Sequence, residues 1–191
     1  MALNHHHLLL IGGQRSGKSR HAERMGLAWL RQASHHRVTV VATALASDDE
    51  MRLRIERHRL DRPDGFDTLE SSLDLGEALR KQASPERLLI VDCLTLWLTN
   101  ALMPQAVGID HSCPSWPDLR ADLLDALRSI SSPVVLVSNE IGWGVIPMGA
   151  EVRNFVDELG RLNQGVAQCC ERVTLMAAGQ AWTQQVQRWD E

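Results

Sequence analysis

The sequence lacks long hydrophobic runs. None of its apolar stretches approaches the roughly 20 residues that a helix needs to cross a bilayer, so we expect no membrane span within the 191 residues. We also expect no secretory leader, because the first apolar run is short and leads directly into a glycine-rich motif. We therefore expect a cytoplasmic protein without a membrane span.

Cysteine and net positive charge are scarce as well. The four cysteines form no C-x-x-C pair, and the two adjacent ones would point in different directions on a helix. We therefore expect thiols in a reducing cytoplasm rather than a zinc site. The formal net charge of −4 provides no electrostatic surface for a nucleic-acid backbone, so no nucleic-acid partner is expected. The cysteines are Cys93, Cys113, Cys169 and Cys170.

Internal repeats, low-complexity tracts and linkers are absent, so we expect residues 1–191 to form a single domain. Short apolar runs alternate with helical patterns, which is typical of a mostly parallel sheet flanked by helices in an α/β fold. The expected strands are His7–Ile11, Val38–Thr43, Phe66–Glu70, Arg87–Asp92, Pro133–Ser138 and Arg172–Ala177, of which Phe66–Glu70 has the weakest pattern.

Apolar residues at helical spacing predict three amphipathic helices. Ser115 and Pro117 are suited to the cap and the first turn of the second helix. Pro104–Pro117 is the only plausible long loop, either a lid or a surface excursion, and we favour the excursion. The three apolar faces consist of Ala22, Met25, Gly26 and Trp29; of Leu119, Leu123, Ala126, Leu127 and Ile130; and of Val152, Phe155, Leu159, Leu162 and Val166.

The strongest signal is the motif Gly12-Gly13-Gln14-Arg15-Ser16-Gly17-Lys18-Ser19, which follows an apolar run and opens a helix. This G-x-x-x-x-G-K-[ST] pattern forms a loop whose backbone N–H groups cradle phosphate oxygens. Lys18 then reaches the β- and γ-phosphates of ATP or GTP, while the Ser19 hydroxyl ligates Mg²⁺. A glycine-rich turn without a ligand is the weaker alternative. The motif makes the expected fold a three-layer, RecA-like P-loop NTPase domain.

Two further strand ends carry polar residues. Asp92 closes the apolar run 88–91, at the position where open α/β sheets place their ligands. We expect it to hold the metal, and a cap of the following helix is the compatible alternative. Asn139 and Glu140 open a glycine-containing loop at the same edge and are candidate substrate contacts. The alternative there is a turn in which Asn139 bonds its own backbone.

A charged segment, Ser47–Arg59, predicts a helix with an acidic first turn. Met51, Ile55 and His58 share one face of it, so His58 could end an apolar stripe as a structural histidine. Three arginines close to this histidine are instead typical of an anion site. The residue types alone leave both interpretations open. The three arginines are Arg57, Arg59 and Arg62.

Together these segments resemble the bifunctional adenosylcobinamide kinase / adenosylcobinamide-phosphate guanylyltransferase family of cobalamin biosynthesis. The P-loop alone indicates only an NTPase, whereas the string that contains the histidine and the S-N-E-x-G-x-G string are far more specific. The resemblance runs nearly end to end. Its strings are GGQRSGKSRHAE at 12–23, VATAL at 41–45, DDEMRLRIERHR at 48–59, LLIVDCLTLWLTN at 88–100, VSNEIGWGVIP at 137–147 and RNFVDELGRLNQ at 153–164.

The resemblance implies two reactions. ATP or GTP phosphorylates the primary hydroxyl of the aminopropanol arm of adenosylcobinamide, and GMP then passes from GTP to adenosylcobinamide phosphate through a covalent histidine–GMP intermediate, releasing pyrophosphate. It implies that His58 is this nucleophile, beside Lys18 as the other catalytic residue. Ser19 and Asp92 remain the expected metal site, and the sequence does not decide whether Glu70 and Asp92 contact the guanine or the metal. The implied nucleotide-binding residues outside the P-loop are Ala42, Thr43, Ala44, Arg59, Leu60, Asp61, Arg62, Glu70 and Asp92.

Some features of the chain depart from the family. Gln14 replaces a smaller residue, the segment 105–117 matches no family string, and the ending 179–191 lacks the usual apolar residues, which puts the last strand in doubt.

The family also implies a homotrimer in which the histidine helix meets a neighbouring subunit. Two alternatives stay open: a P-loop kinase of another small alcohol with a structural His58, and a nucleotide-dependent switch without transferase activity. The sequence ranks neither ATP against GTP nor one shared pocket against two.

Overall fold

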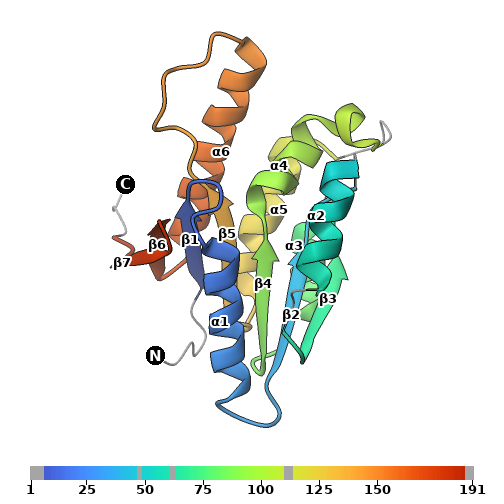
Figure 1. Cartoon of the computed structure of the whole chain (residues 1–191), viewed down its shortest axis with the longest axis vertical. Coiled ribbons are helices and arrows are strands. Elements are labelled where there is room, and N and C mark those ends of the chain that lie inside the picture. Colours follow the sequence, from blue (N-terminus) through green and yellow to red (C-terminus); the bar gives the residue numbers. More distant parts are fainter. Residues whose placement is uncertain (1–6, 47–48, 61–62, 110–113, 188–191) are drawn as a thin grey trace.

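A computed structural model describes residues 7–46, 49–60, 63–109 and 114–187, apart from the side chains of residues 54 and 57–60. Strands and helices alternate along these ranges (Figure 1). The strands are β1 (Leu8–Gly12), β2 (Arg37–Ala42), β3 (Phe66–Glu70), β4 (Arg87–Asp92), β5 (Val134–Asn139), β6 (Arg172–Ala177) and β7 (Gln180–Gln185). The helices are α1 (Lys18–Leu30), α2 (Asp49–Leu60), α3 (Leu75–Gln82), α4 (Leu94–Leu102), α5 (Trp116–Ser129) and α6 (Ala150–Cys169), with a short 3₁₀ helix at Pro104–Val107.

The strands form one seven-stranded sheet in the order β3-β2-β4-β5-β1-β6-β7. The first six strands in this order pair in parallel, and only β7 runs antiparallel, against β6. One strand, β5, separates β1 from β4, so the strand that enters the P-loop is not adjacent to the strand that ends at Asp92. The predicted three-layer α/β fold with a mostly parallel sheet is confirmed, whereas the RecA-like class stays a prediction.

Helices cover both faces of the sheet. Because successive strand residues point to opposite faces, β4 sends Leu88 and Ile90 to the side of α1, and Leu89 and Val91 to the side of α3, α4, α5 and α6. All four of these side chains are buried. This double burial explains why the central strands read as continuous apolar runs rather than as alternating patterns.

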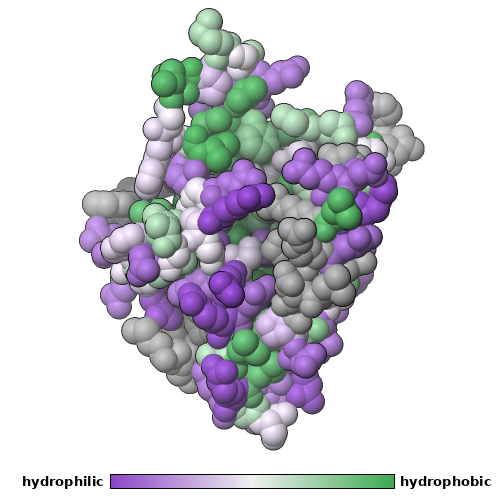
Figure 2. All heavy atoms as spheres, viewed as in Figure 1, coloured by the Kyte–Doolittle hydropathy of each residue, from purple (hydrophilic) through white to green (hydrophobic). Residues whose placement is uncertain are grey.

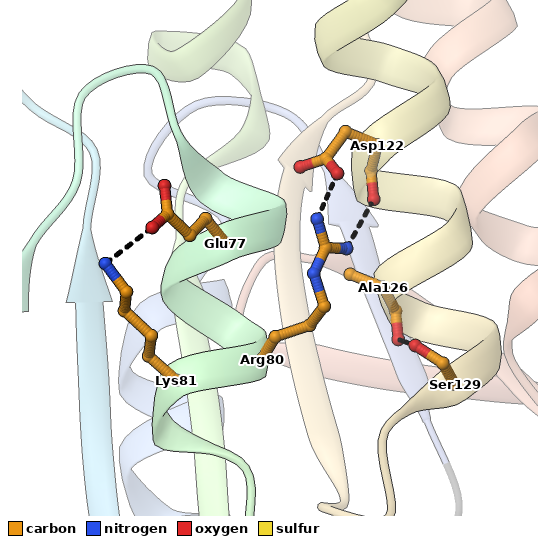
Figure 3. A network of polar contacts seen from close by, with 6 residues as sticks. All are labelled: Glu77, Arg80, Lys81, Asp122, Ala126 and Ser129. Atoms are coloured by element: carbon orange, nitrogen blue, oxygen red, sulfur yellow. Dashed lines mark hydrogen bonds and ion pairs between the residues drawn. The ribbon is translucent and has the colours of Figure 1, made fainter.

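Two helices on the second face, α3 and α5, lie in close contact (Figure 3). Gly76 permits this, since a β-carbon at that position would lie 2.7 Å from the backbone oxygen of Asp122. Arg80 of α3 bonds both the carboxylate and the backbone oxygen of Asp122. The contact anchors α3. This helix follows the loop at the end of β3 and so borders the edge of the sheet where the parallel strands end.

The helix predictions hold with one exception. The Ser115 hydroxyl caps α5 by accepting a hydrogen bond from the Asp118 N–H at 3.4 Å, and the predicted face of α5 is buried except for its last residue, Ile130, which is partly buried. The prediction that Val152 belongs to the buried face of α6 is wrong, because its side chain is 52% exposed. Within the described ranges, no helix combines the length and the apolar character that crossing a membrane requires.

The strand at the end of the chain, β7, was not predicted. It pairs with β6 over its whole length, although every one of its residues is exposed. Ala178 and Gly179 connect the two strands with positive φ angles of 49° and 75°, the backbone of a tight two-residue hairpin turn. The doubt about the last strand is thus resolved in favour of a strand that lacks an apolar face.

Candidate active site

The candidate site residues gather where the parallel strands end. The register pairs Glu70 with Ala42, and Ala42 with Asp92, across β3, β2 and β4. On the other side, Gly12 at the end of β1 lies opposite Asn139 at the end of β5. Because the carboxyl ends of parallel strands meet at one edge, residues far apart in sequence form a continuous row there.

The P-loop connects β1 to α1, and the side chain of Lys18, at the start of α1, bonds back to the loop backbone. The Lys18 ammonium donates hydrogen bonds to the carbonyl oxygens of Gly12, at 2.9 Å, and Gly13, at 2.7 Å. Gly17 precedes α1 with a φ of 99°, a left-handed conformation that glycine adopts readily. Lys18 is only 7% exposed. The loop therefore holds a cation at the N-terminus of a helix, where the backbone already favours anions.

A pocket of about 400 Å³ opens beside this loop. The helix dipole, the loop amides and the basic side chains all favour an anion in this phosphate pocket. Gly12 and Gly13 do not line it but provide the carbonyls that hold Lys18. Its lining consists of Gln14, Arg15, Ser16, Gly17, Lys18, Ser19 and Arg20 from the loop and α1, with Asp92, Cys93, Leu96, Val137 and Asn139.

A second, smaller pocket of about 90 Å³, which we call the apolar pocket, adjoins the phosphate pocket. The two share Ser19, Asp92, Cys93 and Leu96 in their linings. Apolar side chains make most of its wall, and three carboxylates also line it, so it suits a mostly apolar ligand that carries hydrogen-bonding groups. Its other lining residues are Glu23, Val40, Ala42, Ala44, Met51, Ile55, Thr68, Glu70 and Ile90.

Glu23, which the sequence reasoning missed, lies one helical turn after Ser19 and lines the same pocket. Glu70 and Asp92 approach this apolar pocket from the strand ends. In the described part of the chain, no group of three or more His, Cys, Asp or Glu side chains could hold a metal ion. Ser19 and Asp92 still fit Mg²⁺, since this ion commonly takes one or two protein oxygens and completes its shell with phosphate and water.

Thr43 holds the segment that follows β4. Its hydroxyl donates to the Cys93 carbonyl at 2.7 Å and accepts from the Cys93 N–H at 2.9 Å. Its own N–H donates to the Asp92 carbonyl at 3.2 Å, and its carbonyl accepts from the Asn100 side chain at 2.8 Å. The fully buried Thr43 thus fixes Asp92 and Cys93, while its neighbours Ala42 and Ala44 line the apolar pocket. Asn100 was not foreseen as part of this arrangement.

Asp92 is the last residue of β4, and the N-cap of α4 is Cys93, without a side-chain capping bond. Asp92 therefore does not cap α4.

The alternative role expected for Asn139, a side chain that bonds the backbone of its own turn, fits Glu140 better. A carboxylate oxygen of Glu140 accepts the Gly142 N–H at 2.8 Å. Asn139 lines the phosphate pocket.

The histidine segment lies on α2. Met51 and Ile55 of this helix line the apolar pocket, and position 58 continues the same helical face three residues later. The side chains of His58, Arg59 and Leu60 lie outside the described residues, as do Asp61 and Arg62 entirely. The predictions for these five residues therefore still rest on the sequence.

The C-terminal hairpin supports the P-loop, which the sequence did not indicate. The Gly179 N–H in the turn between β6 and β7 donates to the Ser16 carbonyl at 3.0 Å. Met176 on β6 lies opposite Gly12 in the register. The strand next to β1 and its hairpin turn thus pack directly against the phosphate-binding loop.

Comparison with known proteins gives a consistent result. Residues 8–183 match the sequence model of the family described as cobinamide kinase / cobinamide phosphate guanyltransferase. The chain is 46% identical to the bifunctional adenosylcobalamin biosynthesis protein CobP of Pseudomonas aeruginosa, over 90% of this chain and 92% of that protein. It is 36% identical to CobU of Escherichia coli, a protein with the same description, over 90% of this chain and 96% of that protein.

Among solved structures, the chain is similar to the flagellar accessory protein FlaH of Methanocaldococcus jannaschii, with a TM-score of 0.47 and 13% identity, covering 94% of this chain and 76% of that one. A KaiC-like protein of Pyrococcus horikoshii gives a TM-score of 0.49 and 12% identity, covering 90% and 71%. These likenesses are too distant to add to the site.

Proposed function

The chain belongs to the cobinamide kinase / cobinamide phosphate guanyltransferase family, and we propose that its two reactions use the adjoining pockets at the carboxyl edge of the sheet. It is a bifunctional enzyme of adenosylcobalamin biosynthesis: a kinase for adenosylcobinamide and a guanylyltransferase for adenosylcobinamide phosphate. The observation that carries the proposal is the shared lining of the two pockets, Ser19 and Asp92 among it. One nucleotide can then span both, with its phosphates at the P-loop and its base among aliphatic side chains.

In the kinase step, the P-loop and Lys18 hold the phosphates of ATP or GTP. Lys18 is buried and already directed at the loop carbonyls, so its ammonium can exchange these partners for phosphate oxygens and stabilise negative charge on the transferring group. The substrate hydroxyl attacks the γ-phosphorus, and the bond between that phosphorus and the oxygen bridging to the β-phosphate breaks. Asn139, in the wall of the phosphate pocket, and Glu140 beside it are the proposed contacts for the corrinoid arm.

Mg²⁺ would be held by the Ser19 hydroxyl and the Asp92 carboxylate, which both line the phosphate pocket. These hard oxygen donors match its preference. When bound, the ion neutralises phosphate charge. Glu70 is proposed to contact the guanine, because it stands at the end of β3 and lines the apolar pocket.

In the guanylyltransferase step, we propose His58 as the nucleophile. A neutral imidazole nitrogen attacks the α-phosphorus of GTP, and the bond to the β-phosphate oxygen breaks as pyrophosphate leaves with the electron pair. An oxygen of adenosylcobinamide phosphate then attacks the same phosphorus, and the phosphorus–nitrogen bond breaks. Imidazole suits both halves, since it is nucleophilic near neutral pH and leaves readily once it is phosphorylated. The position of α2, whose Met51 and Ile55 line the apolar pocket, supports this role.

The proposed function can be tested directly by following which phosphate of the nucleotide is transferred to the corrinoid. Adenosylcobinamide would be incubated with the protein and Mg²⁺, once with γ-labelled ATP and once with unlabelled ATP and α-labelled GTP. We expect the γ label in the monophosphate product and the α label in the GDP-linked product. Transfer of the γ label alone would support the plain-kinase alternative, and nucleotide binding without any transfer would support the switch.

We also propose a homotrimer in the cytoplasm, where the ATP and GTP that both reactions consume are available. Six of the eight large hydrophobic side chains that are exposed in the described residues lie in 141–152. We refer to residues 141–149, the loop between β5 and α6, as the apolar arm. Hydrophobic residues gather there on the upper part of the molecule (Figure 2), and an apolar surface of this kind usually contacts a partner. The exposed side chains of the region are Ile141, Trp143, Val145, Ile146, Met148 and Val152.

Light scattering on the double variant Trp143→Ser/Val145→Ser tests the assembly. We expect the wild type to have the mass of three chains and the variant to have a lower mass. Trp182→Ser is the matched control, because Trp182 is also exposed, at 54%, but lies on β7. An unchanged mass in the double variant would exclude the arm as the interface.

A further inference from the structure

We propose that Asn163 is a positioning residue for the phosphate pocket, a role that rests on the function proposed for that pocket. Asn163 lies in the middle of α6, is 6% exposed, and lines neither of the two pockets. Its side-chain oxygen accepts a hydrogen bond from the Ser138 hydroxyl at 2.6 Å. Its amide nitrogen donates to the Asn139 carbonyl at 3.0 Å. Asn163 thus holds two consecutive residues at the end of β5.

The chemistry of this contact requires an amide. The Asn139 carbonyl can only accept, so the amide nitrogen must face it and the amide oxygen must face Ser138. An aspartate would place an acceptor against the carbonyl, and a leucine would leave a buried hydroxyl and a buried carbonyl without their partner. Both ends of the side chain are therefore used, and its orientation is determined by its neighbours.

The residues that Asn163 holds are bonded to the P-loop. The Glu140 N–H, next to Asn139, donates to the Gly12 carbonyl at 3.1 Å. That same carbonyl accepts a hydrogen bond from the Lys18 ammonium at 2.9 Å. A shift of the β5 end would therefore move Gly12, the first residue of the P-loop, and with it the phosphate-binding loop.

The β5 end is also held from α4, where the Thr95 hydroxyl oxygen accepts the Asn139 N–H at 3.0 Å. Asn139 is thus fixed on its N–H side by Thr95 and on its carbonyl side by Asn163. The apolar arm leaves the sheet directly after this point and returns as α6, which carries Asn163. The hydrogen bonds of Asn163 therefore tie α6 to the end of β5.

The test compares Asn163→Asp and Asn163→Leu with Val166→Ala. Val166 lies one turn further along α6 and is fully buried in the core, but has no part in these hydrogen bonds. For each full-length protein we would measure the thermal midpoint, the Kd for ADP by titration, and the kcat and KM of adenosylcobinamide phosphorylation. We expect both Asn163 variants to bind ADP about 10-fold more weakly and to lose about 10- to 100-fold in kcat, since small misplacements in an active site have effects of this size.

Val166→Ala should lower the thermal midpoint but leave the Kd and kcat as in the wild type, which separates positioning from general destabilisation. Ser138→Ala removes one of the two bonds, and we expect about a threefold effect on the Kd for ADP; this variant serves if the Asn163 variants do not fold. A folded Asn163→Leu or Ser138→Ala with wild-type Kd and kcat would overturn the proposal. A wild type that binds ADP but does not phosphorylate adenosylcobinamide would instead refute the proposed function, and the Kd comparison would still decide the role of Asn163.

Discussion

Adding a single methyl group at Gly12 should be far more damaging than adding one at Gly13. A β-carbon at Gly12 would lie 2.2 Å from the backbone oxygen of Met176 and 3.1 Å from the Ser16 hydroxyl. The backbone oxygen belongs to the neighbouring strand β6 and cannot move without shifting that strand. Gly12 also has a φ of 156°, which side-chain-bearing residues rarely adopt. A β-carbon at Gly13 would have nothing within 4 Å.

The expected magnitude for Gly12→Ala follows from these two effects. Forcing a methyl group into a packed site destabilises by about 1–3 kcal/mol, and the unfavourable φ adds about 1–3 kcal/mol. The centre of the summed range, about 4 kcal/mol, corresponds to a Tm lowered by roughly 8–16 °C in a chain of this size. Gly13→Ala should change the free energy of unfolding by less than about 0.5 kcal/mol.

Thermal and urea unfolding of the two variants beside the wild type would measure this difference. Nucleotide need not be present, because the clash is a property of the protein alone. Equal stability of Gly12→Ala and Gly13→Ala would refute the reasoning, since it would mean that β1 and β6 are not as close at the P-loop as the structure has them. A loss in both variants would point instead to the loop conformation as a whole.

Two further predictions concern stability. The Trp116 indole N–H donates to the Glu158 carboxylate at 2.7 Å, and this bond, with Arg161 and Arg120, lowers the pKa of Glu158 from its ordinary 4.5. Since the folded pKa lies below the unfolded one, the stabilisation is present above about pH 4.5 and is lost as the pH falls through the folded value. Glu158→Gln should thus lower the free energy of unfolding at pH 7 by up to about 1 kcal/mol, because the arginine partners are solvent-screened and the glutamine oxygen can still accept the indole N–H. Urea titrations at several pH values should show a smaller loss on acidification than in the wild type, and parallel curves would contradict this. Ala178→Asn should raise Tm by about 1–4 °C in a thermal scan, because Ala178 has a φ of 49° in the hairpin turn and asparagine tolerates that conformation, whereas an unchanged or lower Tm would argue against the turn.

Much of the fold could be predicted because the central strands of the sheet are buried on both faces. Arg87–Asp92 and Arg172–Ala177 were predicted with the bounds that the structure has, since each is an apolar run that ends in a change of composition. The hairpin strand β7 could not be predicted in the same way. It has no buried residue, so its sequence carries no apolar pattern, and its pairing depends on backbone hydrogen bonds and a turn.

Periodicity predicts which face of a helix is apolar but not what covers it. Val152 has the correct spacing for the buried face of α6, yet it is 52% exposed at the beginning of the helix, next to the exposed apolar arm. The polar contacts beneath the pockets were missed for a different reason. Asn100 with Thr43, and Asn163 with Ser138, join residues 57 and 25 positions apart, and no local pattern indicates such a pairing. The residues that the sequence did indicate, such as Asp92, stand at strand ends.

The most direct test of the account is whether His58 becomes covalently bound to GMP. The protein would be incubated with Mg²⁺ and α-labelled GTP in the absence of corrinoid, beside a His58→Ala variant with a wild-type thermal midpoint. We predict that the wild type alone acquires a label, which is released by acid and stable to alkali, as a phosphorus–nitrogen bond to imidazole requires. A wild type that binds GTP but stays unlabelled, or a His58→Ala variant that is labelled equally, would contradict the central claim.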